Sequence, residues 1–246
     1  MNITLIVPCF NEALRLDPKY YEDLLTQTEV SLVFINDGST DNTLNLLTAL
    51  KNRNPGRIIL VSLQNNLGKA NAIREGMLLF HNSLDKNPDF LGYLDADCAF
   101  GISDIKKLFE ISTNKKIGEY DVISMARIDL AGRSVQRKRY RQIIGRILGI
   151  FLRLTLPNFK MYDTQTGLKI FRCQSSLFQA LDNQFETRWF IDLEIILRLQ
   201  QTKPNLLIWE EPCDKWQDID NSKIEGKQVF QVIRDMLILF TLVINI

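Results

Sequence analysis

The stretch "YLDADC" (residues 93–98) carries two carboxylates, Asp95 and Asp97, separated by one small residue. They follow "FLGYL" (residues 90–94), whose continuous apolar character is typical of a buried strand. Two crowded anions repel each other unless a cation joins them. A hard divalent ion binds one or two carboxylates and takes phosphate oxygens and water as its other ligands. The pair therefore favours a bridge from a metal ion to a diphosphate, although two loop carboxylates would also explain these residues.

Three further clusters of polar or small residues each follow an apolar run. They are "PCFNE" (residues 8–12), "NDGSTDNT" (residues 36–43) and "NNLGKANA" (residues 65–72). In open parallel sheets, ligands bind beyond the carboxyl ends of the strands. A turn and a helix cap explain "NDGSTD" taken alone, but four clusters on one sheet edge indicate a ligand site. The sequence has neither G-x-G-x-x-G after the first run nor G-x-x-x-x-G-K-[ST], which argues against a dinucleotide fold and a P-loop.

Apolar runs alternate with helical patterns in the first half of the chain, which predicts an α/β fold with a mostly parallel sheet flanked by helices. We expect strands over residues 3–8, 31–36, 57–63, 90–94 and 120–126, and a later strand over residues 167–171. Helices are expected over residues 39–52, 68–80 and 103–111. Another helix should begin near Pro18, with Asp17 as its cap. After Ala126, basic residues and amphipathic helical patterns predict a substrate-facing part of the same domain.

Composition argues against several kinds of site. The single histidine, His81, leaves no basis for a His-rich metal site or a His-based triad. Cys9, Cys98, Cys173 and Cys213 form no C-x-x-C pair, which predicts thiols in a reducing compartment. The net charge of +1 implies no particular partner. No apolar run reaches the ~18 residues of a membrane span, and the N-terminus resembles a strand rather than a signal peptide, so we expect a cytoplasmic protein.

Four motifs, in this order and spacing, resemble those of the family-2 glycosyltransferases, which have the GT-A fold. They are "VPCFNE", "INDGSTDNT", "NNLGKANAIREG" and "LDADC". Three later segments are similar to the polyprenyl-phosphate branch of this family, which includes the dolichyl-phosphate β-glucosyltransferases. They are "DTQTGLKIFR", "ETRWFIDLEIIL" and "WEEPCDKWQDIDNSKI". The resemblance covers nearly the whole chain, although Asn36 stands where the family often has aspartate, and no segment matches the membrane helix that many relatives carry.

The resemblance implies an inverting glycosyltransferase acting at the cytoplasmic membrane face. It would move a hexose, expected to be glucose from UDP-glucose, to a polyprenyl or dolichyl phosphate. Two alternatives remain: the same fold with a saccharide hydroxyl as acceptor, or a nucleotide-sugar-binding protein without catalysis. The intact Asp95/Asp97 pair argues against the latter. We expect one domain (residues 1–246), with a nucleotide-sugar-binding half over residues 1–126 and an acceptor-binding, membrane-facing half over residues 127–246.

The resemblance also implies roles for single residues. The nucleotide-sugar site would comprise Pro8, Asn11, Glu12, Asp37, Lys69, Asp95 and Ala96. Asp37 would accept a hydrogen bond from the imide N–H of a base such as uracil. Asp97 would bind Mg²⁺ or Mn²⁺ directly, Asp95 would touch the ribose or the metal's shell, and the ion would offset charge on the departing nucleoside diphosphate. A turn-capping role is the alternative for Asn11.

Asp192 and Glu194, in "WFIDLE", are candidates for a catalytic base. Two residues apart on a helix, they do not face the same way, so one should point into the site and the other should lie on a solvated face. Asp163 is expected to orient the sugar or an acceptor-binding arginine. Asp97, Asp163 and Asp192 thus form the candidate catalytic set. Trp189 packs either against the sugar or in the core.

Residues 130–162 contain no acidic side chain, and apolar residues recur there at helical spacing. One interpretation is a basic amphipathic helix lying in a membrane interface, and the other is a core-facing helix with a solvated basic face. The candidates for binding the acceptor phosphate, whose oxygens match the guanidinium fork, are Arg127, Arg133, Arg139 and Arg141. The apolar C-terminal run is interpreted as a second interfacial element or a contact in a homo-oligomer. Nucleic acid is a poor fit, because aliphatic rather than aromatic residues accompany the basic ones.

Overall fold

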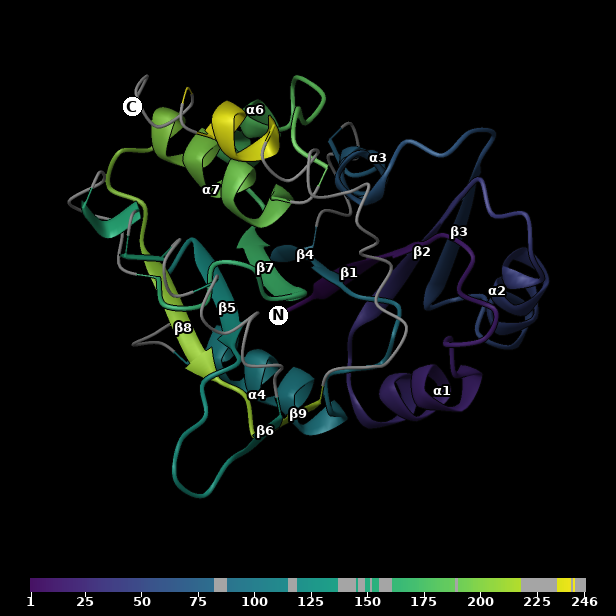
Figure 1. The fold of residues 1–246 in the computed structure, drawn as a ribbon. Coiled ribbons are helices and arrows are strands. Elements are labelled where there is room, and N and C mark those ends of the chain that lie inside the picture. The colour runs from purple at the N-terminus through teal and green to yellow at the C-terminus, as the bar shows by residue number, and fades with distance from the viewer. Residues whose placement is uncertain are drawn as a thin grey trace.

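The computed structural model describes residues 1–81, 88–114, 119–136, 145, 149–150, 152–154, 161–188, 190–217, 234–239 and 241. Within them, a seven-stranded sheet has the order β3-β2-β1-β4-β7-β5-β8 (Figure 1). The strands are β1 (Ile3–Cys9), β2 (Ser31–Asp37), β3 (Ile58–Leu63), β4 (Phe90–Leu94), β5 (Val122–Ala126), β7 (Leu168–Arg172) and β8 (Ile208–Pro212). They all run parallel except β7, which pairs antiparallel with both β4 and β5.

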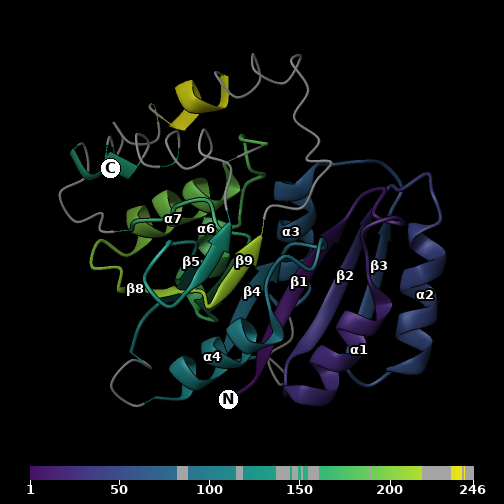
Figure 2. The same cartoon turned by 60° about the horizontal axis from the view of Figure 1, so that its bottom comes forward.

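Helices cover both faces of the sheet (Figure 2). They are α1 (Pro18–Gln27), α2 (Thr43–Arg53), α3 (Lys69–Leu78), α4 (Ile102–Thr113), α6 (Ser175–Ala180) and α7 (Ile191–Thr202). As expected, α1 has Pro18 at its first position, and the side chain of Asp17 accepts a hydrogen bond from the Lys19 N–H at 2.9 Å. A separate parallel ribbon consists of β6 (Ser134–Gln136) and β9 (Lys215–Gln217).

Successive residues of β1 face opposite layers, as the two-residue repeat of a strand requires. Ile6 packs in a buried cluster with residues of α3 and α7, such as Ile73 and Leu193. Leu5 and Val7 pack in a second cluster with residues of α1, α2 and α4. Because neither face of this strand meets water, its side chains are apolar on both sides, which explains the continuous apolar run in the sequence.

Strand β7 lies in the middle of the sheet although it comes late in the chain. The sequence predicted a strand here but not its antiparallel direction. Gly92 of β4 allows the close approach of the two strands, because a Cβ at this position would lie 2.2 Å from the carbonyl oxygen of Lys169. The insertion of β7 brings residues 163–167 to the edge of the sheet where β4 ends, since the Asp95 N–H donates to the Gly167 carbonyl at 3.0 Å.

The predicted elements of the first half are confirmed to within a few residues at their ends. Strand β8 and helix α6 were not expected. Of the amphipathic helices expected in the C-terminal half, α7 and a helical stretch over residues 234–239 fall in the described part, whereas residues 137–144 lie outside it. Across the portions of the chain that are described, no helix is both long and apolar enough to span a bilayer.

Candidate active site

The loops after β1 and β2 meet through Asn11. Its Oδ1 accepts a hydrogen bond from the Thr40 N–H at 2.8 Å, and its own N–H donates to Ser39 Oγ at 3.1 Å. Asn11 has a φ of 52°, in the left-handed region that asparagine enters more readily than most residues. The turn-fastening role expected as the alternative for Asn11 is therefore present, and its contact with a nucleotide stays a prediction.

Pro8 and Glu12 frame the same edge of the sheet. Pro8 lies near the end of β1, in register with Ile35 of β2. Glu12 is buried, its N–H donates to Thr43 Oγ1 at 2.8 Å, and its Oε2 accepts a hydrogen bond from Arg15 Nε at 2.7 Å. Glu12 thus holds the loop after β1 against the start of α2, and the predicted contacts of both residues with base and ribose stay predictions.

Asp37 shapes the loop that leads into α3. Its two carboxylate oxygens accept hydrogen bonds from the N–H groups of Leu67 at 2.7 Å and Gly68 at 2.9 Å. Burial raises the pKa of Asp37, and these two bonds oppose that rise. Asp37 is buried, with 2% of its surface exposed, and its hydrogen bond with a base N–H stays a prediction.

The carboxylates of the "DAD" segment lie in different surroundings. Asp95 Oδ1 is 2.6 Å from Lys69 Nζ. Asp97 Oδ1 accepts a hydrogen bond from the Ala99 N–H at 3.2 Å, and burial together with the negative charge of Asp95 raises the pKa of Asp97 to about 6. Between them, the Ala96 carbonyl accepts a bond from Tyr21 OH at 3.2 Å. The loop is therefore held from the α1 side, while Asp97 carries a negative charge that a nearby cation would stabilise.

The residues present fit a divalent ion that is shared with a ligand. Nowhere in the described ranges do three or more His, Cys, Asp or Glu side chains gather around one point. Asp95 lies close enough to Asp97 to raise its pKa, so an ion at this edge would have these two carboxylates as its protein ligands. Mg²⁺ is commonly bound in this manner, by one or two carboxylates with phosphate oxygens and water completing the shell.

Gly167 determines where the Asp95 carboxylate can lie. A Cβ at position 167 would stand 2.2 Å from Asp95 Oδ2 and 2.4 Å from its Cγ. Any side chain at this position would therefore push the Asp95 carboxylate aside. Gly167, which directly precedes β7, was not among the site residues predicted from the sequence.

Asp163 binds an arginine, one of the two roles expected for it. Its carboxylate faces Arg127 in a two-point ion pair, with Nε to Oδ2 at 2.7 Å and Nη2 to Oδ1 at 2.9 Å. The guanidinium also lies 5.1 Å from the centre of the Trp216 ring. Glu210 holds the segment in place, because its carboxylate accepts the N–H groups of Tyr162 and Asp163, each at 2.6 Å. Arg127 is thus largely committed to Asp163, and its binding of an acceptor phosphate stays a prediction.

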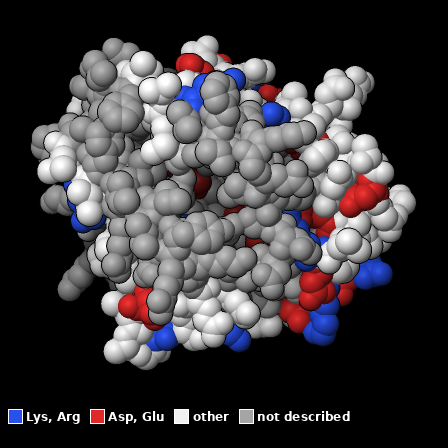
Figure 3. Space-filling view, in the orientation of Figure 1, with Lys and Arg blue, Asp and Glu red and all other residues white. Residues whose placement is uncertain are grey.

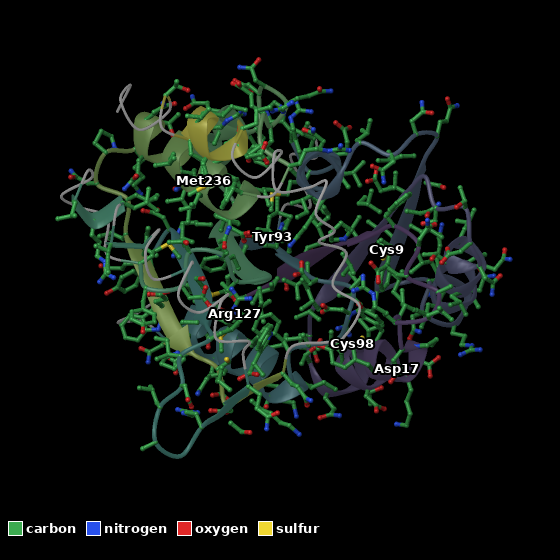
Figure 4. The ribbon with its side chains drawn as sticks, in the orientation of Figure 1. Cys9, Asp17, Tyr93, Cys98, Arg127 and Met236 are labelled. Carbon is green, nitrogen blue, oxygen red and sulfur yellow. The ribbon has the colours of Figure 1, made fainter. Side chains whose placement is uncertain are left out.

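Asp192 belongs to a buried cluster that the sequence did not reveal. Lys169, the second residue of β7, is fully buried, and its Nζ is 3.0 Å from Asp192 Oδ1. The same Nζ donates to the carbonyls of Thr166 at 3.0 Å and Thr164 at 3.2 Å. The hydroxyl of Tyr93, which is labelled in Figure 4, donates a hydrogen bond to Asp192 Oδ1. Burial lowers the pKa of Lys169, and the charge of Asp192 opposes that shift.

The expectation that Asp192 or Glu194 would lie on a solvated helix face is wrong. Glu194 is fully buried. Its carboxylate accepts hydrogen bonds from the N–H groups of Glu186 at 3.0 Å and Thr187 at 2.8 Å, and it forms an ion pair with Arg198 at 2.6 Å. Asp192 is 4% exposed. The two side chains do face different ways, but α7 packs against the sheet on one side and is covered by the segment before it on the other.

The charged side chains of the site lie close enough together to shift one another's pKa. Burial alone would lower the pKa of Lys69, yet Asp95, Asp192 and Asp97 raise it. Burial would likewise lower the pKa of Arg127, but Asp163, Asp192 and Asp95 raise it. On the face drawn in Figure 3, acidic atoms are accordingly visible in recesses near the middle of the molecule as well as at its rim.

The remaining candidates lie away from this group or outside the described residues. Arg133 pairs with Asp214, beside the β6–β9 ribbon. Arg139, Arg141 and Trp189 fall outside the residues that the structure describes. Their predicted roles in acceptor and sugar binding therefore stay predictions.

Comparison with known sequences gives one family. The model of "Glycosyl transferase family 2" matches residues 4–178. The dolichyl-phosphate β-glucosyltransferase of Dictyostelium discoideum is 28% identical over 238 residues, which cover 91% of this chain and 68% of that protein. A dolichyl-phosphate β-glucosyltransferase of Trichomonas vaginalis is 26% identical over 246 residues, which cover 95% of this chain and 69% of that protein.

Comparison with solved structures confirms the expected GT-A-type fold. Glucosyl-3-phosphoglycerate synthase from Mycobacterium tuberculosis, in complex with Mn²⁺, UDP and glucosyl-3-phosphoglycerate, superposes with a TM-score of 0.70 at 14% identity, covering 98% of this chain and 79% of that one. A mannosyltransferase from Pyrobaculum calidifontis, in complex with GDP-mannose and Mn²⁺, gives a TM-score of 0.65 at 14% identity, covering 99% and 64%. At these identities the likeness extends to the fold alone.

Proposed function

The chain belongs to glycosyl transferase family 2, and on that premise we propose that it transfers glucose from UDP-glucose to a polyprenyl phosphate such as dolichyl phosphate, with inversion. The observation that carries this proposal is the extent of the similarity to the two dolichyl-phosphate β-glucosyltransferases. It covers more than nine tenths of the chain, so it includes both the donor-side loops and the later half. UDP-glucose is the donor we propose, because both relatives are glucosyltransferases and Asp37 would accept a hydrogen bond from the imide N–H of uracil.

Donor binding is assigned to the edge of the sheet where β1, β2 and β4 end. Pro8, Asn11, Glu12 and Asp37 would line the pocket for base and ribose. Asp97, with Asp95, would hold Mg²⁺ or Mn²⁺, and the bound ion would supply the positive charge that stabilises the departing nucleoside diphosphate.

The surroundings of Asp192 favour a phosphate acceptor over a saccharide hydroxyl. A hydroxyl needs a general base within hydrogen-bond reach, whereas a phosphate monoester is already anionic at pH 7 and needs positioning instead. Asp192 Oδ1 is occupied by Lys169 and Tyr93. These two donors fix the carboxylate in place, which suits a residue that positions its neighbours better than one that takes up a proton.

The ionisation of the phosphate group provides a test of whether the acceptor is a polyprenyl phosphate. At saturating Mn²⁺ and UDP-glucose, we expect transfer to a short polyprenyl phosphate to rise about tenfold from pH 5 to pH 7, because the second pKa of a phosphate monoester is about 6. A more acidic phosphate analogue should move this profile to lower pH, which separates the acceptor from any enzyme group. Radiolabelled glucose measures the transfer.

Two other results would replace the proposal. Transfer to a saccharide, with a pH profile that does not change with the acceptor, would favour the hydroxyl alternative. Binding of UDP-glucose without transfer to either acceptor would favour a non-catalytic protein. The pH profile is preferable to the Asp192→Asn variant here, because this variant also leaves Lys169 buried without its counter-charge, which is strongly destabilising.

The proposed lipid acceptor requires contact with a membrane surface, expected at the cytoplasmic face. Ile150, Leu154 and Leu237 expose 53%, 79% and 63% of their surface, and Arg153 lies beside two of them. Exposed aliphatic residues next to a basic one suit an interface with anionic lipids.

Vesicle sedimentation tests this contact. We expect the protein to bind anionic vesicles at low salt and to lose binding as salt is added. Leu154→Asp should weaken binding about tenfold, as expected for losing the burial of one leucine side chain. Ile59→Asp is the matched control, because Ile59 is also exposed, at 46%, but lies on the far edge strand β3. Equal losses in both variants, or no binding by the unaltered protein, would contradict an interfacial role for this surface.

A further inference from the structure

Three carboxylates of the site are each paired with a different basic side chain. Asp163 pairs with Arg127, Asp192 with Lys169 and Asp95 with Lys69. Asp97 instead accepts the Ala99 N–H. The two candidate metal ligands therefore differ in their partners: Asp95 is paired with Lys69, whereas Asp97 is bound by a backbone N–H.

The two lysines of this group are held very differently. Lys169 is fully buried and bound by three oxygen atoms. Lys69 has a side chain that is 36% exposed, and its Nζ lies 2.6 Å from Asp95 and 5.9 Å from the centre of the Tyr93 ring. Lys169 lies at 6.0 Å from the same ring. Lys169 is thus fixed in the core, whereas Lys69 has room to move along its flexible stem.

We propose that Lys69 and the divalent cation compete for Asp95, and that Lys69 moves from Asp95 to the diphosphate of the donor when the cation binds. This inference rests on the proposed function, which supplies the metal and the nucleoside diphosphate. An ammonium group 2.6 Å from Asp95 Oδ1 occupies one of the positions from which a metal would bind that oxygen. Two cations at one carboxylate also repel each other.

The diphosphate is the natural second partner for Lys69. An ion that binds Asp95 and Asp97 brings its phosphate ligands to the same edge of the sheet. Lys69 is then beside a new anion, and a lysine ammonium is a compact charge with three rotatable donors that suits phosphate. Lys69 would thereby make metal and nucleotide binding mutually favourable. The diphosphate draws Lys69 away from Asp95, which removes the competitor of the metal, and the metal releases Lys69 to bind the diphosphate.

The experiment is a Mn²⁺ titration followed by electron paramagnetic resonance, with and without saturating UDP. Without UDP, we expect Lys69→Met to bind Mn²⁺ about tenfold more tightly than the unaltered protein, as for removal of one close, partly screened charge. With UDP present this gain should vanish, because Lys69 no longer competes. By linkage, Mn²⁺ should then improve UDP binding less in Lys69→Met than in the unaltered protein.

The structure offers a closely matched control in Lys203. Its Nζ lies 2.6 Å from Asp121, and its side chain is 38% exposed. Asp121 directly precedes β5 and so lies at the amino ends of the parallel strands, whereas Asp95 follows the carboxyl end of β4. Lys203→Met should therefore leave Mn²⁺ binding unchanged. Lys69→Arg, which keeps the charge, should also stay within about twofold of the unaltered protein, since it retains the competing cation.

The results that would overturn the inference are distinct. Unchanged or weaker Mn²⁺ binding by Lys69→Met without UDP would exclude competition. If Lys69→Met bound Mn²⁺ more tightly by the same factor with and without UDP, the removal of one positive charge would explain the gain. That result would exclude the movement of Lys69 to the diphosphate. These titrations need no acceptor, so a failure of transfer to polyprenyl phosphate would refute the proposed function and leave the Lys69 result standing.

Discussion

Asp97→Asn should lower the rate of glucose transfer by about 10³-fold or more at saturating UDP-glucose and Mn²⁺. The loss of a charged ligand removes the ion's stabilisation of the leaving group, which is worth several kcal/mol, and each 1.4 kcal/mol is tenfold in rate. Metal-dependent binding of UDP should weaken as well. Steady-state kinetics and calorimetric titration measure the two effects.

The control for this variant is Asp17→Asn. Asp17 caps α1, and asparagine caps a helix about as well as aspartate, so activity should be retained. Full activity of the unaltered protein in the presence of a strong chelator would refute a metal role for Asp97.

Gly167→Ala should lower the rate of transfer by about 10²-fold, as expected when a small displacement disturbs the positioning of reacting groups. A Cβ at this position would overlap Asp95 Oδ2, which lies 2.2 Å away. The carboxylate can rotate away from the new methyl group, so the loss should appear in activity while the melting temperature changes little. Transfer assays and thermal unfolding together measure this separation.

Gly56→Ala provides a matched substitution, because a Cβ at position 56 would meet nothing within 4 Å. It should leave both activity and melting temperature close to those of the unaltered protein. If Gly167→Ala were as active as Gly56→Ala, the position of the Asp95 carboxylate would not matter for the reaction.

The elements that the sequence predicted best are those with the simplest local signals. Strands β1 and β2 are continuous apolar runs, and α1 begins with a cap and a proline. Strand β8 was missed because "IWEEP" contains two acidic residues and is only partly buried. Its place in the sheet depends on pairing with β5, a partner that lies far away in the sequence.

The candidate site was predictable where it depends on loops that follow strands. The polar clusters that contain Lys69 and Asp95 were expected at one edge of the sheet, and the distance of 2.6 Å between these two side chains agrees with that. Lys169 and Glu210 were missed because their roles come from partners on other elements. A charged residue inside an apolar strand, as in "GLKIFR", was the available signal for Lys169, since a buried ammonium requires compensating groups.

The antiparallel pairing of β5 with β7 makes residues 127–167 a single insertion within a β-hairpin. Its two ends lie side by side in the sheet, and the Arg127–Asp163 ion pair closes its base. The entropic cost of closing a flexible loop rises by only about 0.6 kcal/mol for each doubling of its length. The part of this segment between Arg127 and Asp163 can therefore lengthen or shorten at a small entropic cost, while Gly167 and the donor-binding sheet keep their positions.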